Sequence, residues 1–146
     1  MAVDDNRITF VEHDFFQPQP LKNAPIYFMR YIIHDWPDKE AQKILKNVRD
    51  AMSTTSRLLI CDRILVPTYH PKADEKDSVE TAPSPLLANW ANSASSGADL
   101  LMMTNFNAKE RTVEEFRTLV NDVGLRVEKL WFQNESLGIL ECVRGD

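Results

Sequence analysis

Glycine is scarce in this sequence of 146 residues: only four glycines occur, and none stands in a Gly-x-Gly setting. The chain therefore offers no glycine-rich turn of the kind that lets a backbone approach a nucleotide-like cofactor closely. Cysteine is also rare, since only Cys61 and Cys142 are present, without the spacing of a metal site or a disulfide framework. We expect both to be buried free thiols in predicted strands, in a reducing cytoplasmic compartment.

A net positive charge and long apolar runs are missing as well. The net charge of -5 argues against a nucleic-acid partner and against anionic membrane surfaces. No apolar run approaches the ~20 residues of a membrane-spanning helix, and the first residues have neither the charge nor the apolar core of a signal peptide. With 43% hydrophobic and 27% charged residues, the composition is that of a soluble globular protein. We expect residues 1–146 to form a single domain.

Apolar periodicity predicts an alternation of strands and helices. The predicted strands cover residues 7–16, 24–33, 58–66, 126–133 and 138–144. One helix is predicted to start near Asp38, a second to lie buried around residues 97–103, and a third to follow a capping box at residues 112–115. A loop that we expect to be mobile covers about residues 67–85. The fold class is therefore α/β, with a βαβ unit of two parallel strands and a C-terminal antiparallel hairpin.

The segment Phe28-Met29-Arg30-Tyr31-Ile32-Ile33-His34-Asp35-Trp36-Pro37-Asp38 is the most informative one for function. An apolar run of strand character ends there in a histidine, an aspartate and a turn. This places an imidazole at the carboxyl edge of a buried strand, where open α/β sheets build their sites. From spacing alone, His34 is either a catalytic base or a structural residue that closes the strand.

Three blocks of residues match a known family. They are His13-Asp14-Phe15-Phe16, the segment from Met29 to Asp38, and Asp99-Leu100-Leu101-Met102-Met103 followed by Lys109-Glu110-Arg111-Thr112. With these blocks, the chain resembles the C-terminal half of the catalytic domain of plant and fungal small-molecule O-methyltransferases, which use S-adenosylmethionine. The resemblance implies methyl transfer to the hydroxyl of a small, usually aromatic, metabolite. It also implies a partial Rossmann-like class I methyltransferase sheet that lacks the first two strands.

The resemblance assigns roles to particular residues. His34 is implied as the general base, with Asp62 and Glu110 as two acids that flank it. The implied contacts with the cofactor come from Asp14, Phe15 and Arg30, and the implied contacts with the substrate from Trp90, Met103 and Phe106. No metal is implied. Ordinary alternatives exist, since Asp62 can pair with Arg63 or Arg57, Glu110 can pair with Lys109 or Arg111, and Trp90 and Met103 can be packing residues.

The expected donor site is incomplete, because the family places its glycine-rich turn and the acid that holds the ribose upstream of Asp14. We therefore expect weak or no binding of S-adenosylmethionine by these residues alone. The strand 24–33 should also form an uncovered sheet edge, which a homodimer or a partner supplying the missing half would cover.

Three functions follow as hypotheses. The chain is part of an O-methyltransferase, a donor-independent acid-base enzyme that catalyses a dehydration, cyclisation, isomerisation or pericyclic step, or a non-catalytic assembly protein.

Overall fold

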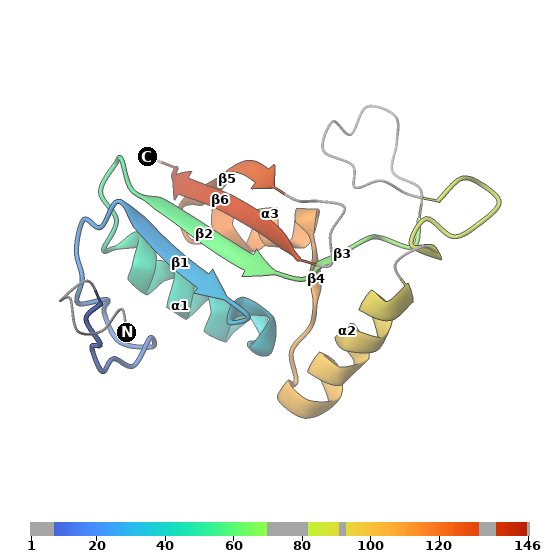
Figure 1. Ribbon diagram of the computed structural model, residues 1–146, viewed down its shortest axis with the longest axis horizontal. Coiled ribbons are helices and arrows are strands. Elements are labelled where there is room, and N and C mark those ends of the chain that lie inside the picture. Colours follow the sequence, from blue (N-terminus) through green and yellow to red (C-terminus); the bar gives the residue numbers. More distant parts are fainter. Residues whose placement is uncertain (1–7, 70–81, 91–92, 132–136, 146) are drawn as a thin grey trace.

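The computed structural model describes residues 8–69, 82–90, 93–131 and 137–145, and for residues 93–95 it describes the backbone alone. A four-stranded sheet has the order β1-β2-β6-β5 (Figure 1). Its strands are β1 (Ile26–Arg30), β2 (Arg57–Asp62), β5 (Leu125–Trp131) and β6 (Gly138–Arg144). The pair β1–β2 is parallel, whereas β2–β6 and β5–β6 are antiparallel. The predicted α/β class, the βαβ unit and the C-terminal hairpin are confirmed.

Two amphipathic helices pack against one face of this sheet. The helices α1 (Asp38–Arg49) and α3 (Val113–Asn121) contact each other on that face (Figure 1). Each contributes a stripe of buried apolar residues at helical spacing, as the sequence predicts. The core is completed by buried sheet residues that include Leu58, Ile60, Leu140 and Cys142. Cys61 and Cys142 are both buried and free, as expected.

Strand β1 is shorter and more exposed than the predicted strand 24–33. It is the edge strand of the sheet, and among the described residues no helix covers its outer face (Figure 1). Ile26 and Phe28 point to that face and are 59% and 58% exposed, whereas Tyr27 on the other face is buried. The prediction of an apolar edge is confirmed. The prediction of a strand buried on both faces is wrong for the described part of the chain.

The predicted strand 7–16 does not form in its described part, residues 8–16. Ile8, Phe10 and Val11 are largely exposed, because no described strand pairs with this segment. A strand needs a partner for its backbone groups, and apolar alternation alone does not supply one. Phe15 and Phe16 instead pack their rings against Trp36, with centroid distances of 5.8 and 4.7 Å.

The predicted strand 58–66 is broken at Arg63 into β2 and the short β3 (Ile64–Leu65). β3 leaves the main sheet and pairs in parallel with β4 (Arg111–Thr112). Thr112 then starts α3 with the predicted capping box, in which Thr112 and Glu115 bond each other's backbone N–H groups. The helix ends at Asn121, and the turn that follows it reaches Gly124, which has a left-handed φ of 76°.

Helix α2 (Ser93–Phe106) confirms the expected helix around residues 97–103 but not its burial. Leu100, Leu101 and Met103 are each more than half exposed, since α2 projects away from the sheet (Figure 1). Residues 70–81 of the expected mobile loop and the expected hairpin turn at 134–136 lie outside the described residues. No helix in the described ranges has the length and apolarity needed to cross a membrane.

Candidate active site

His34 lies in a short 3₁₀ helix, Ile33–Asp35, just beyond the carboxyl end of β1. Its side chain is mostly buried, and its Nδ1 atom lies 3.2 Å from Oε1 of Glu110. A carboxylate only accepts hydrogen bonds, and Glu110 at Nδ1 is closer than Asp35, whose Oδ1 lies 3.4 Å from Nε2. The contact with Glu110 therefore favours the tautomer with the proton on Nδ1, in which Nε2 is the basic atom of the neutral ring. This arrangement suits a histidine that removes a proton from a substrate hydroxyl.

Glu110 reaches His34 because of the β3–β4 pairing. Ile64 pairs with Arg111, which brings Glu110 beside the break at Arg63 and the end of β2. The Nε atom of Arg63 lies 3.7 Å from Oε1 of Glu110. The backbone N–H of Glu110 also donates to Oδ1 of Asp99 in α2 at 2.9 Å. Contacts from different elements therefore position this carboxylate, which is only 2% exposed.

Asp62 is a fully buried acid at the end of β2. Neither of its carboxylate oxygens meets full hydrogen-bond geometry with a partner in the described part of the chain. Burial raises the pKa of Asp62 to about 6, and the nearby charge of Glu110 adds to this effect. A protonated His34 and the approaching backbone N–H groups of Tyr31 and His34 oppose the rise. The structure thus brings Asp62 and Glu110 close to His34, and the catalytic roles that the resemblance implies for them stay predictions.

Several negative groups surround the imidazole. The hydrogen bond to Glu110 is the largest influence and raises the pKa of His34 above 6.5. Burial lowers this pKa, but the charges of Asp62, Glu110 and Asp35 raise it further. Oδ1 of Asp35 lies 3.4 Å from Nε2. The site therefore stabilises the imidazolium that forms when His34 takes up a proton.

Tyr31 is a contact of His34 that sequence reasoning missed. The centroids of the Tyr31 and His34 rings lie 5.4 Å apart, and the Arg30 guanidinium lies 5.3 Å from the centroid of the Tyr31 ring. Tyr31 has a left-handed φ of 55°, which is costly for a residue with a side chain. The aromatic residue three positions before the histidine was the available sequence signal. The Tyr31 ring thus contacts both Arg30, a predicted cofactor residue, and His34, the predicted base.

The other predicted cofactor residues form a separate group. Oδ1 of Asp14 accepts the backbone N–H of Phe16 at 2.9 Å, and the carbonyl of Phe15 accepts from Asn47 of α1 at 3.1 Å. The Phe15 ring meets the edge of Trp36. Among the described residues, no hydrogen bond, ion pair or ring contact joins Asp14 or Phe15 to Arg30 or His34.

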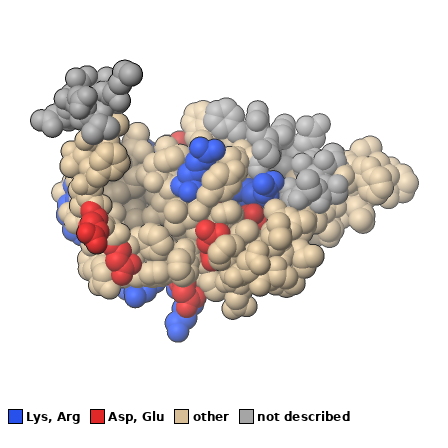
Figure 2. All heavy atoms as spheres, turned by 60° about the horizontal axis from the view of Figure 1, so that its bottom comes forward, with Lys and Arg blue, Asp and Glu red and all other residues tan. Residues whose placement is uncertain are grey.

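The predicted substrate residues are open to solvent. Trp90, Met103 and Phe106 are 63%, 58% and 50% exposed, and in the described chain they make no ring contact or hydrogen bond with His34. Helix α2 does contact the 3₁₀ helix that carries the histidine. Figure 2 shows charged atoms scattered over much of one face, whereas the described atoms at its right-hand end are tan, without blue or red. That composition fits residues 82–90, which contain no charged residue, and α2, whose only charged residue is Asp99.

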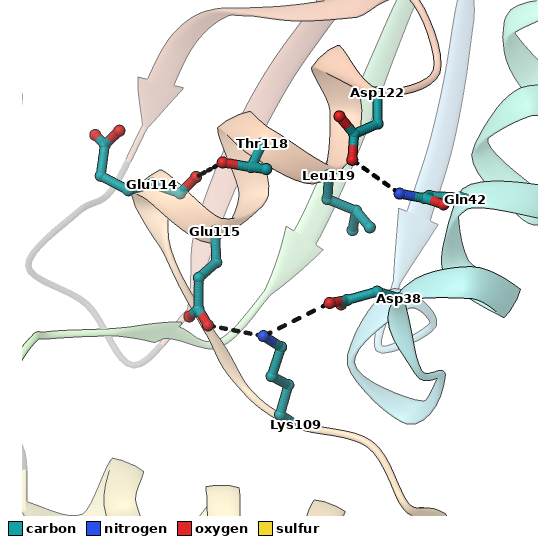
Figure 3. Close-up of a pocket in the computed structure, with 8 residues that line it drawn as sticks. All are labelled: Asp38, Gln42, Lys109, Glu114, Glu115, Thr118, Leu119 and Asp122. Carbon is teal, nitrogen blue, oxygen red and sulfur yellow. Dashed lines mark hydrogen bonds and ion pairs between the residues drawn. The ribbon is translucent and has the colours of Figure 1, made fainter.

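A cavity of about 250 Å³ lies between α1 and α3 (Figure 3). It is lined by Asp38, Gln42, Lys109, Glu114, Glu115, Thr118, Leu119 and Asp122. Lys109 Nζ lies 2.8 Å from Oε1 of Glu115 and 3.7 Å from Oδ2 of Asp38, so the cation bridges the two elements. None of the predicted site residues lines this cavity, and sequence reasoning gave no signal for it.

Comparison with known proteins identifies similar chains. A family model described as an O-methyltransferase domain matches residues 1–126. The O-methyltransferase gedA of Aspergillus terreus is 38% identical over 99% of this chain, which covers 29% of that protein. The O-methyltransferase cicE of Emericella nidulans is 39% identical over 96% of this chain and 25% of its own length. This chain therefore spans less than a third of the curated relatives it matches.

Solved structures give the same picture. The mitomycin 7-O-methyltransferase MmcR has a TM-score of 0.74 at 26% identity, and this chain matches it over 98% of its own length and 37% of that chain. LepI, described as a pericyclic reaction enzyme, has a TM-score of 0.68 at 28% identity, over 90% of this chain and 29% of that one. LepI has also been solved in complex with S-adenosylmethionine. These neighbours share the α/β fold and differ in the reaction that they catalyse.

Proposed function

Because the chain belongs to the O-methyltransferase domain family, we propose that it forms the substrate-deprotonating part of an S-adenosylmethionine-dependent O-methyltransferase of small-molecule metabolism. The observation that carries this proposal is the buried contact between Nδ1 of His34 and Oε1 of Glu110, with Asp62 beside it. The proposed substrate carries a hydroxyl on an aromatic ring.

The chemistry explains why a base is needed. A phenol has a pKa of about 10, so little of it is ionised near neutral pH. Nε2 of His34 would take the hydroxyl proton while Nδ1 keeps its hydrogen bond to Glu110. The negative charges of Glu110, Asp62 and Asp35 stabilise the resulting imidazolium. The donor, when bound, supplies an electrophilic methyl group, and in-line placement of the two reactants lowers the rest of the barrier.

The residues of this chain fit the donor in part. The exposed guanidinium of Arg30 at the end of β1 matches the charge of the donor's carboxylate. Asp14 and Phe15 would face the adenosine end, although Asp14 already accepts the N–H of Phe16 and Phe15 packs on Trp36. We therefore propose weak donor binding by these 146 residues alone. A micromolar dissociation constant from titration calorimetry on this chain would contradict that proposal.

The uncovered surfaces support a larger assembly. β1 is the edge strand, its outer face exposes Ile26 and Phe28, and α2 exposes Leu100 and Leu101. Paired or covered edges are the rule, because open apolar edges aggregate. We propose that residues 1–146 form part of one methyltransferase domain, with the β1 edge covered in a homodimer or by further polypeptide. A monomeric mass of this chain by light scattering at micromolar concentration would contradict the dimer.

Methyl transfer from labelled S-adenosylmethionine to a panel of phenolic metabolites tests the proposed function in the full protein. We expect His34→Ala to reduce kcat by about 10²–10⁴-fold, the range for loss of a general base. Glu110→Gln keeps the imidazole and should reduce kcat by less. Glu141→Gln is the matched control for Glu110→Gln, because Glu141 pairs with Arg57 on the sheet, away from His34. Full activity of His34→Ala would refute the role of the base.

A donor-independent acid-base reaction is the second candidate. It is favoured by the structural similarity to LepI, a pericyclic reaction enzyme. In this case the reaction would proceed without S-adenosylmethionine turnover and would still be lost in His34→Ala. Product formation without release of S-adenosylhomocysteine would identify this function. A protein with no turnover of either kind, and unchanged behaviour on His34→Ala, would instead be a binding or assembly protein.

A further inference from the structure

Arg111 is a buried cation that holds the turn containing His34. Its residue is 1% exposed, and its guanidinium donates to two backbone carbonyls and one carboxylate. Nη1 donates to the carbonyl of Ile33 at 2.9 Å, and Nη2 donates to the carbonyl of Trp36 at 2.8 Å. Nε and Nη2 both donate to Oδ1 of Asp38, at 3.1 and 2.8 Å. The two carbonyls flank His34 in sequence, so the guanidinium fixes the turn from both sides.

We propose that Arg111 is the positioning residue of the base: it holds residues 33–36 in the conformation that places His34 Nδ1 against Glu110. This inference rests on the proposed role of His34 as the base. Glu110 and Arg111 are consecutive residues, so one short segment supplies both the carboxylate that contacts the ring and the guanidinium that holds the ring's backbone.

The segment itself is held firmly. Arg111 pairs with Ile64 in the β3–β4 ladder, Thr112 caps α3, and the N–H of Glu110 donates to Asp99. The distance between His34 and Glu110 is therefore set by a fixed strand on one side and by Arg111 on the other. A lysine would not replace this arginine, because one ammonium on a flexible stem cannot reproduce a planar fork that bonds three acceptors.

The charge of Arg111 and its positioning role have opposite effects on the pKa of His34. The groups that face the imidazole or its partner are Asp35, Asp62, Glu110, Arg63 and, through the Tyr31 ring, Arg30. If Arg111 acted only as a nearby positive charge, its removal would raise the pKa of His34. If it positions the turn, its loss breaks the bond to Glu110 and lowers that pKa.

The test is an NMR titration of the His34 ring nitrogens in the full protein. Arg111→Met removes both the charge and the fork, whereas Arg111→Lys keeps the charge and loses the fork. We expect both variants to lower the pKa of His34, toward the value in Glu110→Gln, and to weaken the preference for the Nδ1–H tautomer. We expect kcat to fall up to about a hundredfold, the scale for a small misplacement of a reacting group.

Val120→Ala is the control for general destabilisation, because Val120 is fully buried in α3 and its side chain has no polar or charged group. It should leave the titration of His34 unchanged. An unchanged or raised pKa of His34 in folded Arg111→Met would overturn the proposal.

If neither Arg111 variant folds, Asp38→Ala is the decisive variant. It frees one end of the guanidinium but keeps the two carbonyls. Because loss of the Asp38 charge by itself lowers the pKa of His34, the measurement here is the tautomer of the ring. A folded Asp38→Ala protein should show a weaker preference for the Nδ1–H tautomer of His34, and a wild-type preference would overturn the proposal.

The titration does not depend on turnover, so the two proposals fail separately. An active His34→Ala protein refutes the role of the base and leaves the link from Arg111 to the turn intact. A normal titration of His34 in the Arg111 variants refutes the positioning role and leaves the methyltransferase proposal intact.

Discussion

Nδ1 of His34 lies 3.2 Å from Oε1 of Glu110, although the two residues are 76 positions apart in the sequence. His34 lies in the turn after the edge strand β1. Glu110 lies in the segment that follows α2, directly before β4. The contact is buried on both sides, so neither group can turn to water without leaving the other unpaired.

The pH dependence of activity should report this contact. We expect kcat/KM to rise with pH through the pKa of His34, which lies above 6.5, because only the neutral ring accepts a proton. Glu110→Gln should move the midpoint to lower pH, since the hydrogen bond that favours the imidazolium is lost. A pH–rate profile of both proteins measures the shift, and a midpoint that stays in place in Glu110→Gln would contradict the assignment.

Asp62→Asn should stabilise the protein at neutral pH. The pKa of Asp62 is raised from 3.8 to about 6 in the folded state, so its ionisation opposes folding. The penalty is absent below pH 3.8, grows as the pH rises, and reaches up to about 3 kcal/mol above pH 6. Urea unfolding at pH 4 and pH 8 measures it. An equal effect of the substitution at both pH values would show that burial does not perturb this carboxyl.

Two glycine substitutions should have opposite effects. At Gly138, an added Cβ would lie 2.6 Å from Cγ1 of Ile64, so Gly138→Ala should cost about 1–3 kcal/mol through overpacking. At Gly97 in α2, nothing lies within 4 Å, and Gly97→Ala should stabilise the helix by about 0.5–1 kcal/mol. Thermal unfolding compares the two variants directly. Equal changes in Tm would contradict the close approach of Gly138 to β3.

The start of α3 offers a second matched pair. Thr112→Ala removes the side-chain oxygen of the capping box and should cost about 1 kcal/mol. Thr118→Ala in the same helix removes only an exposed bond to the carbonyl of Glu114, and should be close to neutral. Chemical denaturation of both variants measures the difference. A Thr112→Ala protein as stable as Thr118→Ala would mean that the cap contributes little.

Much of the fold was predictable because local patterns determine it. The helical stripe of Ala41, Ile44 and Leu45, the capping box at Thr112 and the alternation in the last two strands each follow from residues close in sequence. The strand expected at residues 7–16 failed for a related reason: its apolar spacing was correct, but pairing requires a neighbour that local sequence does not specify.

The candidate site divides in the same way. The sequence alone determined that an imidazole follows an apolar strand, and the family resemblance implied Asp62 and Glu110 as the two acids that flank it. Only the tertiary structure decided that the break at Arg63 and the Ile64–Arg111 pairing bring Glu110 to His34. It also placed Tyr31 against the imidazole ring and brought the Arg111 guanidinium to the backbone carbonyl of Ile33 in the turn. Such contacts depend on strand register and on the path of the chain between elements, and neither is encoded in the spacing of a single segment.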